Sequence, residues 1–198
     1  MEDEKISGVE SLQVIQSMIN KAKNQFTESG HLYLLWGWLI LICSVVEFVL
    51  MKVVQYKYHY MIWMVTWIAV IYQIFYIYKK EKMRRVRTYT DDILAFVWIV
   101  FVIMMVLVMI LSGRMLGNES FKIINPVFLA LYGMPTFLSG VILRFKPLRI
   151  GGICCWLLSI LSTFVEPDYR ILFVALAVTI AWIIPGYSLR ARHKKSMA

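Results

Sequence analysis

Six long apolar runs divide this sequence, and short polar segments separate them. The runs cover residues 31–51, 58–78, 91–111, 126–144, 148–165 and 169–189. A helix of about 20 residues rises about 1.5 Å per residue and so covers the hydrocarbon core of a bilayer, which is about 30 Å thick. The pattern therefore predicts an all-α, polytopic membrane protein with six transmembrane helices in one domain over residues 31–189, followed by a basic tail over residues 190–198.

The first 30 residues are polar and carry the most amphipathic pattern of the chain. Ser7 and Glu10 have the spacing of a capping box, which predicts the start of a cytoplasmic helix, and Gly30 is typical of a helix end. One apolar stripe follows at spacings of three and four, made of Leu12, Ile15, Ile19, Ala22 and Phe26. Residues 7–30 have no net charge, whereas helices that bind anionic lipid carry a cationic face, so the stripe is predicted to pack against protein. Its partner is left open between the cytoplasmic ends of the chain's own spans, a second copy, and a cytosolic protein.

Positive charge is concentrated between alternate apolar runs. Residues 79–87 hold six Lys or Arg in nine positions, and short loops rich in these residues stay on the cytoplasmic side of a bilayer. With that loop inside, 16 of the 21 Lys and Arg fall in inner segments, which predicts that both termini are cytoplasmic. The hydrophobic fraction of 60% indicates a cell-membrane protein with the lipid bilayer as its surroundings. Because topology accounts for the net charge of +9, that charge indicates no nucleic-acid partner.

Polar side chains are rare in the first three runs. Glu47 is the one full charge inside an apolar run, about one turn from the predicted outer boundary, where it can reach water, Lys52 or Lys57. An acid at bilayer depth is a functional candidate, but here the structural interpretation is favoured. Gln73 is predicted to hydrogen-bond to a neighbouring helix. Residues 93–111 carry no polar side chain, which predicts that the third span is the most exposed to lipid.

Proline and small residues set the fourth and fifth runs apart. Pro135 cannot donate to the carbonyl of Leu131, which predicts a kink and a free acceptor near mid-membrane. That carbonyl lines a small polar cavity together with Thr136 and Ser139, or it is satisfied by the hydroxyl of Thr136 or Ser159. The packing interpretation is favoured over a ligand site.

Local signals predict where the helices begin and end. Thr90-Asp91-Asp92 opens the third span, as a cap followed by the acids that a helix dipole favours. Residues 112–124 form the longest outer loop, and Asn125-Pro126 starts the fourth span. A short turn at Phe145-Lys146-Pro147 makes the fourth and fifth spans an antiparallel hairpin, and Pro185-Gly186 breaks the sixth span near its inner end.

No catalytic, cofactor or metal motif rises above this background. The chain lacks the nucleophile-elbow, zinc-protease and phosphate-loop patterns, and its three histidines are dispersed. Cys43, Cys154 and Cys155 all fall inside apolar runs, where an odd number of thiols indicates neither a disulfide framework nor a metal site. The sequence therefore predicts no cofactor, no bound metal and no enzymatic activity.

The hairpin of the fourth and fifth runs carries a resemblance. It extends from Gly133-Met134-Pro135-Thr136-Phe137 through Gly140, Phe145-Lys146-Pro147-Leu148 and Gly151-Gly152 to Trp156, and it also touches the Leu34-Leu35-Trp36-Gly37-Trp38 run. These segments resemble a group of small, uncharacterised bacterial membrane proteins with six spans. The resemblance implies that fold and a location in the inner membrane of a bacterium. It brings no activity, cofactor or catalytic residue with it.

Together these observations predict a non-enzymatic integral membrane protein with an accessory or sensing role, acting through its N-terminal helix and its basic inner loops. The alternative is a small transporter or channel, whose path is lined by Glu47, Gln73, Pro135, Thr136 and Ser139. The two are distinguished by whether those side chains converge on one water-accessible cavity.

Overall fold

The computed structural model describes residues 12, 13, 16, 30–83 and 89–197, and nearly all of them are helical. The longer helices are α2 (Gly30–Lys52), α3 (Val65–Met83), α4 (Tyr89–Leu116), α5 (Phe121–Ile142), α6 (Lys146–Thr163), α7 (Arg170–Val178) and α8 (Ile184–Met197). Between them lie three 3₁₀ segments, η2 (His59–Met64), η3 (Gly117–Ser120) and η4 (Pro167–Tyr169), and one π-helical segment, η5 (Thr179–Ile183). No strand occurs in this part of the chain. The predicted all-α class is therefore confirmed.

Within the described residues, five helical stretches are long and apolar enough to cross a membrane. They are Gly30–Lys52, His59–Lys79, Tyr89–Leu116, Phe121–Ile142 and Pro167–Arg192, and they match the predicted first, second, third, fourth and sixth spans. The predicted fifth span forms α6, which is not among the five. The cations Lys146 and Arg149 and the serines of this 18-residue helix lower its mean hydropathy. Five apolar helices indicate a protein embedded in a membrane.

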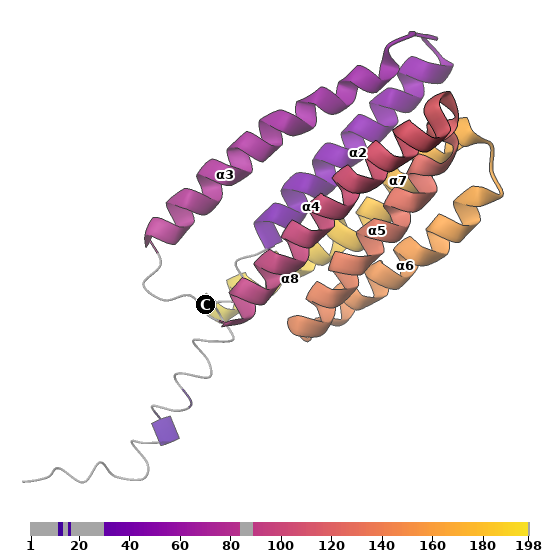
Figure 1. The fold of residues 1–198 in the computed structure, drawn as a ribbon. Coiled ribbons are helices and arrows are strands. Elements are labelled where there is room, and N and C mark those ends of the chain that lie inside the picture. The colour runs from indigo at the N-terminus through magenta and orange to yellow at the C-terminus, as the bar shows by residue number, and fades with distance from the viewer. Residues whose placement is uncertain (1–11, 14–15, 17–29, 84–88, 198) are drawn as a thin grey trace, which may run out of the picture.

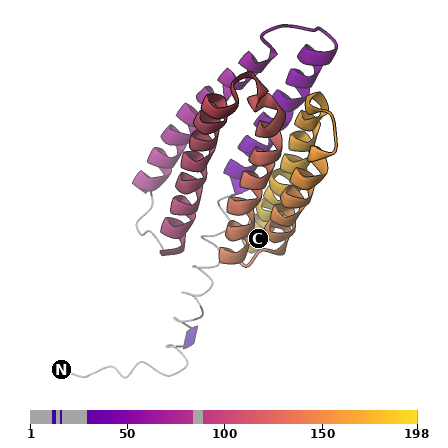
Figure 2. The same cartoon turned by 45° about the vertical axis from the view of Figure 1, so that its right-hand side comes forward.

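In the described part of the chain, the helices form six rods. The rods run side by side, and rods adjacent in sequence run in opposite directions (Figures 1 and 2). The last rod is continuous through α7, η5 and α8. One end of the bundle, which we call the Gly30 end, holds the start of α2, the α5–α6 turn and α8, and here the Arg192 guanidinium lies over the Phe145 ring. The other, the Lys52 end, holds the end of α2 and the α6–α7 connection, where Lys52 pairs with Asp168 at 2.6 Å. α6 thus spans the same height of the bundle as its neighbours.

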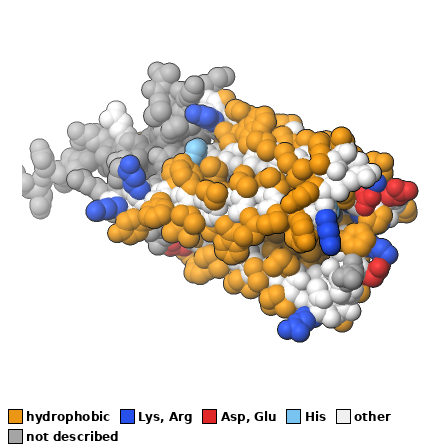
Figure 3. Space-filling view, turned by 90° about the horizontal axis from the view of Figure 1, so that it is seen from above, with side chains coloured by type: hydrophobic (Ala, Val, Ile, Leu, Met, Phe, Trp, Pro, Cys, Tyr) orange, Lys and Arg blue, Asp and Glu red, His pale blue; other side chains and the backbone are white. Residues whose placement is uncertain are grey.

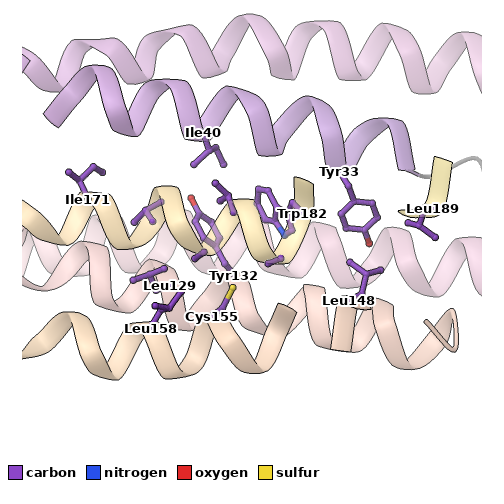
Figure 4. Packing of buried hydrophobic residues seen from close by; sticks show 14 of the residues in the cluster. Tyr33, Ile40, Leu129, Tyr132, Leu148, Cys155, Leu158, Ile171, Trp182 and Leu189 are labelled. Atoms are coloured by element: carbon purple, nitrogen blue, oxygen red, sulfur yellow. The ribbon is translucent and has the colours of Figure 1, made fainter. Parts of the chain in front are cut away.

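The core lies where α2, α5 and α6 meet the last rod. Figure 4 shows Ile40 of α2, Tyr132 of α5, Cys155 of α6 and Trp182 of η5 gathered there. Close approach of α6 to η5 depends on Gly151, since a Cβ at that position would come within 2.7 Å of the Ala181 Cα. The buried residues of the protein are therefore concentrated in four of its six rods.

α3 and α4 lie at the margin of this core. In their apolar stretches 6% and 0% of the residues are buried, against 56% in the last rod. The predicted third span, α4, thus has the smallest buried share of the five apolar stretches, and α3 is exposed to a similar degree. Figure 3 shows apolar side chains over the middle of one face and charged side chains gathered toward its two ends, which is the distribution that a bilayer solvates.

The predicted outer loop at residues 112–124 and the predicted helix start at Asn125-Pro126 are wrong. α4 continues to Leu116 and α5 already begins at Phe121, so Pro126 lies inside a helix. A proline there leaves the carbonyl of Lys122, four residues earlier, without its helical donor. The Arg170 guanidinium donates to that carbonyl instead, which explains why the helix tolerates the proline.

Pro185-Gly186 does not break the last rod, contrary to the prediction. The chain is π-helical over Thr179–Ile183, and the Ile184 N–H bonds to the Thr179 carbonyl, five residues back. This wider turn accommodates the proline, and α8 runs on to Met197, so the predicted tail continues the helix. Gly186 allows α8 to approach α2, because a Cβ there would lie 2.9 Å from the Leu34 side chain.

Two further local predictions fare differently. α4 begins at Tyr89, so Thr90 lies inside the first turn and does not cap it, while Asp91 and Asp92 stand in the first turn as predicted. The prediction of Asp91 and Asp92 in the first turn is confirmed. The helix dipole favours acids anywhere in that turn, so this prediction does not depend on the exact residue at which the helix begins.

The predicted α5–α6 hairpin is confirmed, and its turn is tightly hydrogen-bonded. The Phe145 N–H bonds to the Gly140 carbonyl at 2.9 Å, and the Arg144 N–H bonds to the Val141 carbonyl at 3.1 Å. This pair of bonds ends a helix when the residue after the C-cap is left-handed, a position that glycine usually occupies. Arg144 takes that conformation here, with φ of 49°.

Candidate intramembrane polar residues

The polar side chains predicted to form an intramembrane site lie in three separate groups. Glu47 belongs to the last turns of α2, near the Lys52 end, and Gln73 lies near the middle of α3. Pro135, Thr136 and Ser139 belong to α5, and Ser159 faces α5 from α6. The three groups bond to different neighbours.

Glu47 is held by two side chains of the 3₁₀ segment η2. Its Oε2 accepts from the Trp63 indole N–H at 2.6 Å, and its Oε1 lies 3.2 Å from His59 Nδ1. The side chains of Glu47 and His59 are 13% and 29% exposed. Of the three alternatives considered for Glu47, namely water, Lys52 and Lys57, the pairing with Lys52 is wrong, because Lys52 pairs with Asp168. The carboxylate therefore ties η2 to α2.

Gln73 makes the predicted hydrogen bond to a neighbouring helix. Its Oε1 accepts from the Trp36 indole N–H of α2 at 2.5 Å. One turn closer to the Gly30 end, His31 Nε2 lies 3.3 Å from the Tyr72 hydroxyl, and its ring lies 5.1 Å from the Tyr76 ring. α3 is thus attached to α2 by a few polar and aromatic contacts, with little apolar burial.

The α5 group is buried among helices. Thr136 is fully buried, donates to the Tyr132 carbonyl at 2.7 Å and accepts from the Trp182 indole N–H at 2.8 Å. Pro135 and Ser139 are also fully buried, and the Ser139 hydroxyl has no hydrogen-bond partner among the described residues. This group links α5 to η5 across the core.

Neither hydroxyl proposed for the Leu131 carbonyl donates to it. Thr136 bonds one residue further along, to Tyr132, and Ser159 donates to the Pro126 carbonyl at 2.7 Å. The Trp156 indole N–H donates to the Ala130 carbonyl at 3.1 Å. That part of the sequence interpretation is wrong, because the rotation of α6 against α5 sets which carbonyls its side chains reach.

Arg170 is a structural residue that the sequence interpretation missed. Its Nε donates to the Val165 carbonyl at 2.9 Å and its Nη2 to the Thr163 carbonyl at 3.5 Å, while Nη1 reaches the carbonyl of Lys122. It thereby joins the end of α6 to the start of α5. A signal was present, because a cation in the first turn of α7 opposes the helix dipole and so needs another partner.

The remaining candidate residues are the apolar stripe of the N-terminal segment and the three cysteines. Leu12 is helical and 67% exposed, whereas the rest of the apolar stripe, Ile15, Ile19, Ala22 and Phe26, lies outside the described residues. Cys43, Cys154 and Cys155 are free thiols. Among the described residues, no group of three His, Cys, Asp or Glu side chains is placed to hold a metal ion.

Chemically, the described polar groups are hydrogen-bond donors and acceptors that join pairs of helices: α2 with η2, α2 with α3, and α5 with η5 and α6. No family model, no curated protein and no solved structure matches this chain. The interpretation of the site therefore depends on its own geometry.

Proposed function

We propose that this chain is a six-span protein of a bacterial inner membrane with a non-enzymatic accessory or sensing role. Its N-terminal segment forms an amphipathic cytoplasmic helix, and this helix and the basic inner loops contact a partner protein or a second copy. One observation carries the proposal: the polar side chains of the spans are bonded to their own helical neighbours in three separate places. Such bonds hold helices together and leave recognition to the polar segments outside the membrane.

The sixth crossing in this proposal is α6. At about 1.5 Å per residue, its 18 residues cover roughly 27 Å, which is close to the hydrocarbon thickness of about 30 Å. Its cations Lys146 and Arg149 lie in its first turn, at the Gly30 end, where they can stay at the cytoplasmic surface. With six crossings both termini are cytoplasmic, in agreement with the 16 of 21 Lys and Arg in inner segments.

Site-specific labelling tests the threading. In a chain whose native cysteines are replaced, we expect Met115→Cys to react with a membrane-impermeant maleimide in intact cells, because Met115 is 80% exposed beside the α4–α5 connection. Lys82→Cys, exposed at the other end of α3, should react only after permeabilisation. If both positions react in intact cells, or Lys82→Cys alone does, the threading is wrong.

The partner helix is tested by substitutions within the apolar stripe. Replacing Ile15 and Ile19 by serine should change the size of the assembly or its site-specific photo-crosslinks, since the stripe is the contact surface. The matched control, Gln16 and Asn20 replaced by serine, changes the same region of the sequence without touching the stripe. Unchanged assembly, protein level and crosslinks after deletion of residues 7–29 would exclude a partner role for this segment.

A transport path through Glu47, Gln73 and the α5 group gains no specific support. Each of these groups has bonding partners of its own, and a path requires that they face one aqueous cavity.

A further inference from the structure

A groove open to one side of the bundle runs along α2, between α3 and α8. Its volume is about 440 Å³. The lining side chains are mainly apolar. One face of α2 supplies six of them, His31, Leu34, Leu35, Trp38, Leu39 and Ile42, while α3 supplies Ala69 and α8 supplies Tyr187 and Arg190. The groove exists because α3 is attached to α2 at few points and leaves the adjacent face of α2 uncovered.

The length of the groove matches one leaflet of a bilayer. From His31, in the first turn of α2, to Ile42 is eleven residues, or about 16 Å along a helix. Half of a hydrocarbon core of about 30 Å is about 15 Å. The groove therefore begins at the membrane surface of the Gly30 end and stops near the midplane, as an acyl chain does.

The surface end of the groove is polar and cationic. Arg190 and His31 line it there. About 10 Å further along α2, the Tyr187 hydroxyl accepts from the Trp38 indole N–H at 3.3 Å. Arg190 is exposed, and none of the ion pairs between described side chains includes it. A positive charge above an apolar groove complements an anionic head group above an apolar tail.

We propose that this groove binds one glycerophospholipid with an anionic head group, its phosphate at Arg190 and an acyl chain along Leu34, Leu39 and Ile42. An exposed cation at the surface end of a mainly apolar groove of about one leaflet's length complements an anionic head group that carries an acyl chain. The open side lets the second acyl chain stay among neighbouring lipids.

Native mass spectrometry of the full chain in mild detergent tests the head-group preference. Titrated with phosphatidylglycerol or phosphatidylcholine of equal chain length, the protein should retain phosphatidylglycerol at least about fivefold better, the factor that one cation near a membrane surface contributes. Arg190→Gln should remove this preference. Arg192→Gln is the matched control, because it removes the same charge two residues away, where the guanidinium lies over Phe145 and not in the groove.

The tail and the phosphate are tested separately. Ala69→Phe adds a ring inside the groove from α3 and should lower retention of both lipids, with unchanged helix content by circular dichroism as the check on folding. Glycerol phosphate added in excess should not displace phosphatidylglycerol, because it lacks the acyl chain. Each of four results would overturn the proposal. They are equal retention of the two lipids, equal effects of Arg190→Gln and Arg192→Gln, no loss of retention with Ala69→Phe, and displacement of phosphatidylglycerol by glycerol phosphate.

Discussion

Single side chains replace main-chain hydrogen bonds that the helices of this protein lack. Pro126 leaves the Lys122 carbonyl without a donor, and Arg170 supplies one. The turn after α5 requires a left-handed residue, and Arg144 adopts that conformation although it has a Cβ. Both arginines are therefore more than topological charges, and both can be tested by substitution.

Arg170→Lys is expected to destabilise the protein by about 2 kcal/mol, because an ammonium group cannot reach three carbonyls in the geometry of a guanidinium fork. The measurement is the apparent unfolding temperature in detergent, followed by circular dichroism. Arg114→Lys is the control, since Arg114 is exposed in the last turn of α4 and should tolerate the change. Equal shifts in the two variants contradict the bridging role of Arg170.

Arg144→Gly should stabilise the hairpin by about 1 kcal/mol, because glycine enters the left-handed region without the steric cost of a Cβ. Arg144→Ala separates this effect from the loss of charge, since alanine keeps the Cβ and should bring no gain. The same unfolding measurement applies. A gain with alanine as large as with glycine shows that charge, and not φ, is the cause.

At the scale of the helix, sequence patterns predicted those features that depend on one segment of the chain alone. Runs of about 20 apolar residues predicted the existence and order of the five apolar spans, and the short turn at Phe145-Lys146-Pro147 predicted the α5–α6 hairpin. Predictions of helix ends failed where a group distant in sequence intervened. Pro126 was interpreted as a helix start, but Arg170 donates to the Lys122 carbonyl that this proline leaves free, and Lys122 and Arg170 are 48 positions apart. Pro185 was read as a break because a π-helical segment has no simple sequence signal.

The polar candidates show the same division. An amide in an apolar run was enough to predict that Gln73 bonds to a neighbouring helix. The identity of its partner, Trp36, depends on how α3 is rotated against α2. Likewise, Glu47 was recognised as exceptional, whereas Trp63 and His59 reach it only because η2 folds back beside α2. Rotation and fold-back are properties of the packed bundle.

Gly151→Val tests the contact between α6 and the last rod. A Cβ at this position would come within 2.7 Å of the Ala181 Cα, so a branched side chain must separate the two helices. We expect a fall in apparent unfolding temperature of at least several degrees. Gly113→Ala is the matched control, because a Cβ at Gly113 meets nothing within 4 Å. If the two variants unfold alike, the close contact does not contribute to stability.

For the whole molecule, the distribution of burial divides the bundle into a core of four rods and a margin formed by α3 and α4. The core is joined by buried side chains such as Thr136 and Trp182. α3 is joined to it mainly by the contacts of Gln73 near the middle of the helix and of η2, through Glu47, at the Lys52 end. Since these attachments are few and polar, the position of α3 and the stability of the core should respond to different substitutions.

We therefore predict that Glu47→Ala combined with Gln73→Leu releases α3 while the core keeps its unfolding temperature. Spin labels at Val45 of α2 and Phe75 of α3, both exposed, should show a broadened distance distribution in the double variant, measured by pulsed electron paramagnetic resonance in lipid nanodiscs. Thr136→Val should do the reverse: it leaves the Trp182 indole N–H without its acceptor, at a cost of about 1–3 kcal/mol, and lowers the unfolding temperature without broadening the distances. If the double variant unfolds at as low a temperature as Thr136→Val, or if both broaden the distances equally, α3 belongs to the same cooperative unit as the core and the division is wrong.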